Sequence, residues 1–376
     1  MTTIIKNAKV FRADGAFQQG DVAIDGEYFS DASAGGTEID AGGRYAIPGL
    51  IDVHLHGCVG RDFTEADVDG IAKMARYQAE NGITAICPTT FTLPEAQLDQ
   101  ACRNIAAACD TPEAAAIAGI HLEGPFFSPH KAGAQNPAYM QPPNIQMVER
   151  LQAAAGGLVK ILSIAPEMPG AMELIDVFAD EIVCSLAHTT ANYEIATEAL
   201  ARGARHITHL YNAMPPLGHR EPGVIGAALD SPHCNVELIC DNVHIHPAVV
   251  RATLRMFGDD RVIMISDSMA AAGLGEGTYE IGGLAVDVRG NTARLANNGP
   301  IAGSVSNLMQ CVRTAVTQMN IPLAQAVKCA SVNPAKAIGI FNERGSIAPG
   351  KYADLVLLNA DLSIHAVYLR GKILNK

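Results

Sequence analysis

Between residues 47 and 265 the chain alternates short apolar segments with segments of helical periodicity. The apolar segments have the length of β-strands and are rich in β-branched residues. They are residues 47–53, 83–90, 116–122, 159–164, 182–186, 206–208, 236–240 and 262–265. Such alternation predicts an α/β fold with a parallel sheet whose faces are covered by helices. Eight such units predict that the sheet closes into a (β/α)8 barrel, the TIM barrel.

The two ends of the chain have a different pattern, in which short strand-like segments are separated by turn signals. Asp25-Gly26 marks a hairpin turn near the start, and Arg370-Gly371 marks a turn near the end. Neither end is long enough to bury a core alone. We therefore expect residues 1–46 and 346–376 to pair into one small β-sandwich domain, beside a barrel formed by residues 47–345.

Most of the predicted barrel strands are followed by a histidine or a carboxylate. These residues are His54, His56, Glu123, His188, His209, His244 and Asp267. The carboxyl ends of barrel strands form the active site, so we expect these side chains to meet at the barrel mouth. Because residues i and i+2 of a strand face the same side, His54 and His56 can reach one ion. Three to five N/O ligands from separate strands can hold one or two divalent metal ions and leave positions open for a substrate.

Other polar residues near the strand ends have simpler interpretations. We expect His121 to be a hydrogen-bonded buried group or a support for a ligand, and His206 to be structural. Asp241 is expected to position His244 through a turn. Cys58 is expected to pack beneath its loop.

Asp267 follows the eighth predicted strand and lies across the mouth from the metal ligands. A carboxylate at this place can take a proton from an attacking water and then deliver it to a leaving amine. The alternative interpretation is a helix N-cap or an Asx-turn, since Ser268 follows directly.

Two long loops are expected at the same end of the barrel. The loop of residues 212–223 offers backbone N–H groups and the guanidinium of Arg220, which suit an anionic oxygen cluster such as phosphate. The loop of residues 126–143, which contains Lys131, is expected to form a further wall. Both segments are also explained as plain connections, although loops of this length are often functional.

The charge balance and the cysteines limit the class of protein. The 27 basic and 39 acidic residues give a net charge of −12, which argues against nucleic-acid binding. No stretch approaches the ~18 apolar residues of a membrane span, and the start lacks the apolar core of a signal peptide. Nine cysteines without a C-x-x-C pair indicate free thiols in a reducing compartment. We therefore expect a cytoplasmic protein with a small-molecule substrate.

Several segments together resemble the amidohydrolase superfamily, and within it most closely the N-acetylglucosamine-6-phosphate deacetylase family. The most specific segments are His121-Leu122-Glu123-Gly124-Pro125-Phe126 and Thr208-His209-Leu210-Tyr211-Asn212-Ala213-Met214. Residues 48–57, 219–223, 302–304, 333–335 and 345–356 also match. The resemblance covers nearly the whole chain.

The resemblance implies roles for the residues at the mouth. Glu123, His188 and His209 would hold the main metal, and His54 with His56 would hold a second one where two ions bind. The implied metal is Zn²⁺, with Fe²⁺, Mn²⁺ or Co²⁺ as alternatives. Asp267 would be the catalytic acid and base, and His244 would contact the sugar and polarise the acetyl carbonyl.

The resemblance also implies a substrate site and an assembly. The substrate-binding residues would be Ala134, Asn212, Ala213, Arg220, His244, Ile301, Ala302, Gly303 and Ser304. The family commonly forms homodimers, in which the phosphate-binding arginine can come from the neighbouring subunit. The segments Ala187-His188-Thr189 and Asp267-Ser268-Met269 depart from the family pattern but keep the functional side chain.

The expected reaction is hydrolysis of the acetamide of N-acetyl-D-glucosamine 6-phosphate to D-glucosamine 6-phosphate and acetate. An N-acetylgalactosamine-6-phosphate deacetylase is an alternative, because the two sugars differ in the direction of one hydroxyl. A cyclic-amide hydrolase is disfavoured, because such members usually have a bridging carboxylated lysine where this chain has Glu123. A non-catalytic binding protein on the same scaffold is disfavoured by the presence of Glu123, His188, His209 and Asp267 together.

Overall fold

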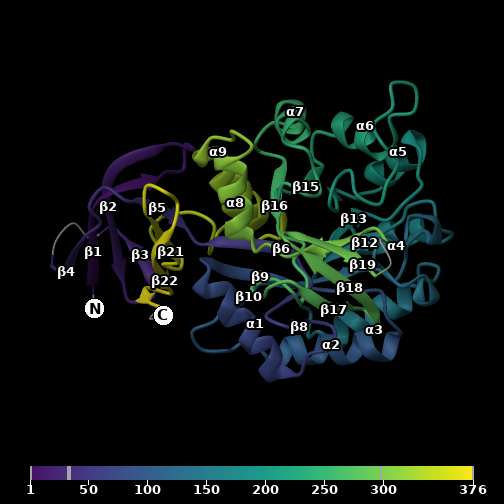
Figure 1. Ribbon diagram of the computed structural model, residues 1–376, viewed down its shortest axis with the longest axis horizontal. Helices are drawn as coiled ribbons and strands as arrows, with labels where there is room; N and C mark the ends of the chain where they lie inside the picture. The colour runs from purple at the N-terminus through teal and green to yellow at the C-terminus, as the bar shows by residue number, and fades with distance from the viewer. Residues whose placement is uncertain (1, 32–34, 297–298, 375–376) are drawn as a thin grey trace.

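The computed structural model describes residues 2–31, 35–296 and 299–374. Figure 1 shows a smaller β-domain, which carries both chain termini, beside a larger part in which strands alternate with helices. Strands from the first and last segments of the chain lie next to each other in the smaller domain (Figure 1). This arrangement confirms the predicted fold class, a (β/α)8 barrel with a small β-sandwich built from both chain ends.

The barrel strands pair in parallel and follow the order of the chain. They are β6 (Leu50–Leu55), β9 (Ile83–Thr90), β11 (Ile120–Glu123), β12 (Val159–Ile164), β13 (Val183–Leu186), β14 (His206–Ile207), β15 (Asn235–Ile239) and β16 (Val262–Ile265). The ends of the series meet through the backbone N–H of Asp267, which donates to the carbonyl of His54 at 2.9 Å. The hydroxyl of Ser266 also donates to a carboxylate oxygen of Asp52 at 2.5 Å. These two bonds join the last strand to the first and nearly close the barrel.

One predicted strand is divided in the structure. The segment 116–122 forms β10 (Ala116–Ile117) and β11, with Gly119 between them. A Cβ at Gly119 would lie 2.2 Å from the side chain of Lys160. The close approach of the neighbouring strand therefore requires glycine at the break.

Helices follow most barrel strands and cover the outside of the sheet (Figure 1). They are α1 (Val68–Glu80), α2 (Glu95–Ala107), α3 (Ile145–Ala154), α4 (Ala171–Phe178), α5 (Tyr193–Ala201), α6 (Gly223–Asp230), α7 (Pro247–Phe257), α8 (Leu308–Thr317), α9 (Leu323–Val327) and α10 (Asn333–Ala337). Side chains at the helix starts accept bonds from free backbone N–H groups. Asn144 and Asn192 do so for α3 and α5, and Asn307 forms a capping box with Gln310 at α8.

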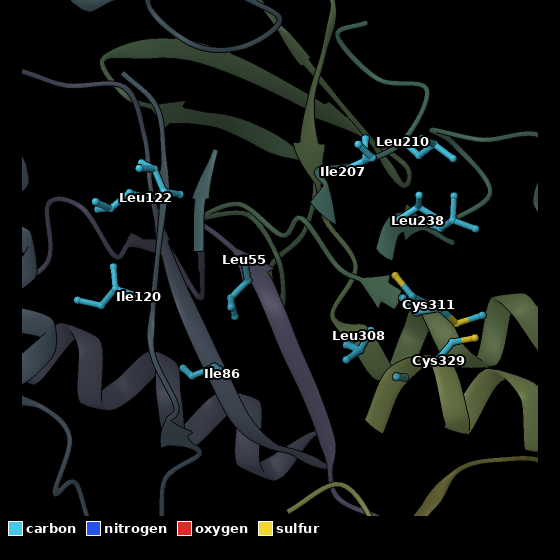
Figure 2. Packing of buried hydrophobic residues seen from close by; sticks show 14 of the residues in the cluster. Leu55, Ile86, Ile120, Leu122, Ile207, Leu210, Leu238, Leu308, Cys311 and Cys329 are labelled. Atoms are coloured by element: carbon cyan, nitrogen blue, oxygen red, sulfur yellow. The ribbon is translucent and has the colours of Figure 1, made fainter. Parts of the chain in front are cut away.

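The main core lies between the barrel and its helices. Figure 2 shows strand residues such as Ile86, Leu122 and Leu238 in one cluster with Leu308 and Cys311 of α8. A second cluster includes strand residues at alternate positions to these. The strands are therefore apolar on both faces, which is typical of parallel strands that helices cover.

The smaller domain contains an eight-stranded sheet from both chain ends. Its strands are β1 (Thr2–Phe11), β2 (Phe17–Asp25), β3 (Tyr28–Ser30), β4 (Thr37–Asp40), β5 (Tyr45–Pro48), β21 (Leu355–Leu358), β22 (Ile364–Leu369) and β23 (Lys372–Ile373). Strand β5 pairs with β1 on one side and with β21 on the other, so it joins the two ends of the chain. Strand β1 continues from Thr2 to Phe11, because a bulge between Ile5 and Ala8 absorbs the polar residues there.

A four-stranded antiparallel sheet follows the barrel and was not predicted. Its strands are β17 (Gly277–Ile281), β18 (Leu284–Arg289), β19 (Thr292–Leu295) and β20 (Ile301–Ser304). Its hairpin turns contain Gly282-Gly283 and Gly290, all at positive φ. Alternating residues around a Gly-Gly pair are a hairpin signal, so the sequence did contain a sign of this sheet.

Within the described ranges, the structure contains no helix of the length and apolarity needed to cross a bilayer.

Candidate active site

Side chains from six different strand ends meet at the mouth of the barrel. His54 lies in β6 and His56 follows it, and Glu123 is the last residue of β11. The other members follow β13, β14, β15 and β16, and they are His188, His209, His244 and Asp267. The structure thus brings together the residues that the sequence analysis assigned to the metal and to acid–base catalysis.

Glu123, His188 and His209 form the first cluster of candidate ligand atoms. Oε1 of Glu123 lies 3.0 Å from Nε2 of His209 and 3.4 Å from Nε2 of His188. The two Nε2 atoms are 3.1 Å apart. Nδ1 of His188 lies 2.8 Å from the backbone carbonyl of Lys131, an acceptor. The Nδ1 atom therefore donates, and Nε2 faces the cluster.

His54, His56 and Asp267 form a second cluster next to the first. The two Nε2 atoms are 3.3 Å apart, and each lies 3.4 Å from Oδ1 of Asp267. Glu123 faces both clusters, because its other oxygen lies 3.3 Å from Nε2 of His56. The side chain of Gln135 donates to this same oxygen.

The donor atoms of the two clusters suit a divalent cation. Imidazole nitrogens and carboxylate oxygens are ligands for such ions, and these residues are less than a tenth exposed. Two ring nitrogens that face each other at 3.1–3.3 Å cannot both point lone pairs at each other without a shared proton or cation. A metal ion among them would resolve this conflict at both pairs.

Electrostatics at the mouth also favour positive charge. Burial alone would raise the pKa of Glu123 and lower that of His56. Nevertheless His54 and the other imidazoles hold the pKa of Glu123 well below its usual value. The carboxylates of Asp267 and Glu123 in turn raise the pKa of His56 to about 9. The cluster therefore attracts cations strongly, either protons or a metal ion.

The backbone at three strand ends has an unusual conformation. His188, His209 and Asp267 have φ angles of 43°, 32° and 47°. Positive φ is uncommon for residues other than glycine, and it is found where a functional site requires a particular side-chain direction. The pairing register of β6 also shifts between Asp52 and Leu55, and such bulges re-aim side chains near active sites.

His244 is held by Asp241. Nδ1 of His244 lies 2.8 Å from Oδ2 of Asp241, and Oδ1 accepts the backbone N–H groups of Val243 and His244. Burial would lower the pKa of His244, but the bond to Asp241 raises it above the usual value. Its free Nε2 is left for a ligand in the cavity.

Asp267 has no helix-capping contact. None of the described helices begins at this residue, and its side chain lies against His54 and His56. Burial would raise its pKa, but the two histidines lower it. Asp267 is thus an ionised carboxylate at neutral pH.

A cavity of about 530 Å³ opens over the clusters. The substrate-binding candidates that line it are Ala134, Asn212, Ala213, His244, Ile301 and Gly303. Ala302 and Ser304 are buried behind the lining. Arg220 is exposed and lies outside the lining. Arg294 of the unpredicted sheet lines the cavity.

Sequence reasoning missed two residues that contact the ligands. Gln135 lies in a loop without any motif of its own. Glu237 lies in the middle of the apolar strand β15 and is fully buried. Since carboxylates are rarely buried unless they are paired, the charge inside an apolar run was a usable signal for Glu237.

His121 and His206 lie below the mouth. The ring nitrogens of His121 lie 3.2 Å from the carbonyl of Val53 and 2.7 Å from the hydroxyl of Ser163. Burial lowers the pKa of His121 to about 3. His206 contacts Glu237 at 3.0 Å. Both histidines therefore act in buried hydrogen-bond networks.

Comparison with known proteins gives one consistent family. Residues 45–374 match the model of the Amidohydrolase family. Over 332 residues the chain is 40% identical to the N-acetylglucosamine-6-phosphate deacetylase of Bacillus subtilis (strain 168). This match covers 87% of this chain and 84% of that protein. It is 33% identical to the N-acetylgalactosamine-6-phosphate deacetylase of Escherichia coli O157:H7, over 90% of this chain and 89% of that protein.

A solved structure has the same fold at similar identity. It is a mutant of the N-acetyl-D-glucosamine-6-phosphate deacetylase from Mycobacterium smegmatis, in complex with N-acetyl-D-glucosamine-6-phosphate. The TM-score is 0.92 at 31% identity, and the match covers 100% of this chain and 99% of that chain.

Proposed function

Because this chain belongs to the amidohydrolase family, we propose that it hydrolyses the acetamide of N-acetyl-D-glucosamine 6-phosphate to D-glucosamine 6-phosphate and acetate. The observation that carries the proposal is the convergence of Glu123, His188 and His209 beside Asp267 at the floor of one cavity. The named relatives with this activity support the choice of substrate.

The metal in this proposal is Zn²⁺, held by Glu123, His188 and His209, with a second ion at His54 and His56. Fe²⁺, Mn²⁺ and Co²⁺ are the alternatives, since mixed imidazole and carboxylate ligands suit all of them. Such an ion supplies Lewis acidity, which polarises a carbonyl and makes water a stronger acid.

Asp267 is the proposed proton carrier. Its ionised carboxylate takes a proton from water while the water oxygen bonds to the acetyl carbon. It then delivers this proton to the sugar nitrogen as the C–N bond breaks, which yields the free amine and acetate. His244 donates a hydrogen bond from Nε2 to the carbonyl oxygen as negative charge develops there, in the imidazolium form that Asp241 favours by raising the pKa of His244. The hydrogen bond that Nδ1 donates to Asp241 keeps the imidazole in the required orientation.

The sugar phosphate is proposed to lie between Ala134, Asn212, Ala213 and the segment that contains Ile301 and Gly303. Ala302 and Ser304 are buried next to these lining residues. Their proposed role is to hold this segment in place. The backbone N–H of Ser304 donates to the carbonyl of Asp267 at 2.7 Å, so β20 is tied to the loop that carries the acid and base.

Acetate release from a panel of sugars tests the proposed reaction. The metal-loaded protein is expected to act best on N-acetylglucosamine 6-phosphate and much more slowly on unphosphorylated N-acetylglucosamine. N-acetylgalactosamine 6-phosphate is the main competitor, because one of the relatives has a name with that substrate. Faster acetate release from N-acetylgalactosamine 6-phosphate would assign that sugar as the substrate instead. Binding without acetate release from any sugar would indicate a non-catalytic protein.

We also propose a homodimer in which Arg220 binds the phosphate in the neighbouring subunit's site. Its exposure outside the cavity lining supports this. Arg220→Ala is then expected to lower kcat/KM for the 6-phosphate substrate roughly 30- to 4000-fold. This factor corresponds to a loss of about 2–5 kcal/mol in stabilisation of the transition state. Slow turnover of the unphosphorylated sugar should hardly change. An equal loss for both sugars would instead assign Arg220 to loop support.

Hybrid dimers distinguish whether Arg220 acts in the site of its own subunit or in that of the neighbouring subunit. Arg220→Ala and Asp267→Asn proteins are each expected to be nearly inactive. When their subunits are exchanged, a mixed dimer contains one site with an intact Asp267 and an intact Arg220 from the other subunit. Recovered activity is expected, and no recovery from two inactive parents would mean that Arg220 acts within its own subunit.

The cytoplasm is the proposed compartment. All nine cysteines are free thiols, and eight of them are buried. Free thiols are typical of proteins in a reducing environment.

A further inference from the structure

Glu237 of β15 contacts residues of both metal clusters from below. We infer that Glu237 is a positioning residue that fixes His54 as a metal ligand and so controls binding of the second ion. This inference rests on the proposed metal ligands. Figure 1 labels β15 beside β16, the barrel strand with which it pairs in parallel.

Three partners occupy the carboxylate of Glu237. Oε2 lies 2.9 Å from Nδ1 of His54 and accepts the backbone N–H of His209 at 3.0 Å. Oε1 lies 3.0 Å from Nε2 of His206. Glu237, His54 and His206 are all 0% exposed, so no solvent competes for these bonds.

The contact with Glu237 determines which nitrogen of His54 carries a hydrogen. An ionised carboxylate can only accept hydrogen bonds, so Nδ1 of His54 must donate. Nε2 is then free to offer its lone pair to a metal, and it faces His56 and Asp267 at 3.3 and 3.4 Å. Ligand histidines usually have such a partner for the second nitrogen, and its loss typically weakens metal binding 10- to 100-fold.

His54 is the member of its pair that has this support. Nδ1 of His56 is buried and has no hydrogen-bond partner among the described residues. The orientation of the second site therefore depends on the bond between His54 and Glu237. Without it, the His54 ring could equally present a protonated Nε2, which cannot bind a metal.

His54, His121 and Glu237 form a third group of closely spaced candidate ligand atoms. We do not assign a metal ion to this group. Both nitrogens of His121 have partners, the carbonyl of Val53 and the hydroxyl of Ser163. Nδ1 of His54 is bonded to Glu237. Neither histidine therefore directs a free lone pair between these three residues. Their role is to hold His54 in place below the barrel mouth.

The two clusters depend on Glu237 to different extents. The backbone around His209 has a second link, since the N–H of Leu210 donates to the backbone carbonyl of Glu237 at 2.9 Å. This link survives any substitution at the side chain. Loss of the carboxylate should therefore weaken the His54–His56 site and largely spare the site at Glu123, His188 and His209.

Zinc binding by the full-length protein tests the inference without using activity. Equilibrium dialysis against a series of free zinc concentrations, with metal analysis, should give two ions per subunit in the wild type. Glu237→Met has a similar volume but no acceptor, and it should bind one ion normally and the other 10- to 100-fold more weakly. Glu237→Gln should recover most of the loss, because its amide oxygen can accept from both His54 and His209.

Ser185→Ala is the matched control. Ser185 is buried on β13, which is separated from β15 by β14. It bonds the hydroxyl of Thr208 at 2.6 Å, but no hydrogen bond joins it to a proposed ligand among the described residues. Its zinc curve should equal that of the wild type. Two equally tight ions in Glu237→Met, or an equal loss in Ser185→Ala, would overturn the inference, as would a wild type with a single site.

A wild type that binds no zinc would instead refute the proposed metal ligands. If Glu237→Met does not fold, histidine nitrogen NMR of the wild type gives the same answer. The signal that disappears in His54→Gln should belong to an imidazole with hydrogen on Nδ1. Hydrogen on Nε2 of that ring in the zinc-loaded protein would contradict the inference.

Discussion

Asp267→Asn is expected to retain the metal content of the wild type and to lose about 10²- to 10⁴-fold in turnover, the usual contribution of general acid–base catalysis. The amide keeps an oxygen at a position 3.4 Å from Nε2 of His54 and His56 in the wild type, so metal binding should survive. It cannot accept a proton, and therefore cannot activate water or protonate the leaving nitrogen. Metal analysis and acetate release on the same sample measure both effects.

Ser268→Ala is the control for this substitution. Ser268 adjoins Asp267, but its hydroxyl donates to the backbone carbonyl of Gly57 and does not line the cavity. Its turnover should stay close to that of the wild type. Near-normal turnover in Asp267→Asn with full metal content would show that another group is the base.

The barrel could be predicted because its strands are buried on both faces. Segments such as Ile83–Thr90 and Val159–Ile164 are mostly apolar, and they form β9 and β12 over the same residues. The shortest of the eight barrel strands, β14 at His206–Ile207, was found because the segment 206–208 leads directly to His209. A pattern of apolar runs that end on polar residues is thus sufficient for this fold class.

The sheet from β17 to β20 could not be found in the same way. Its strands are mostly half-exposed, so they lack the continuous apolar runs of the barrel. Ile281, Arg294 and Ile301 of this sheet nevertheless line the cavity. Residues that enclose a substrate can therefore come from elements with weak folding signals.

The strand ends predicted which side chains meet at the barrel mouth. They did not predict how these side chains are distributed between the two clusters. Glu123 stands between both clusters because its two oxygens face different histidines. Glu237 lies one layer below, where a rule based on strand ends does not look. The position of Arg220 depends on the course of a long loop, and sequence spacing does not determine which side of the cavity such a loop faces.

Removal of the metal is expected to abolish acetate release, and added Zn²⁺ is expected to restore it. It should also lower stability, because a ligand at about 1,000 times its Kd stabilises the folded state by about 4 kcal/mol. Glu123→Gln should resemble the metal-free wild type in both respects. The carboxylate is 1% exposed and faces four imidazoles within 3.0–3.5 Å, so its charge is the main partner for the cation.

The comparison of activity with thermal unfolding makes this prediction specific. In the wild type, zinc should raise Tm and activity over the same range of concentration, since both follow occupancy of the main site at Glu123, His188 and His209. In Glu123→Gln the zinc-dependent rise in Tm should largely disappear. Arg103→Gln is a suitable control, because Arg103 forms an exposed pair with Asp99 on α2, far along the chain from any ligand. Full activity in protein stripped of metal would refute the mechanism, because Asp267 alone would then be activating water without a cation to polarise the amide.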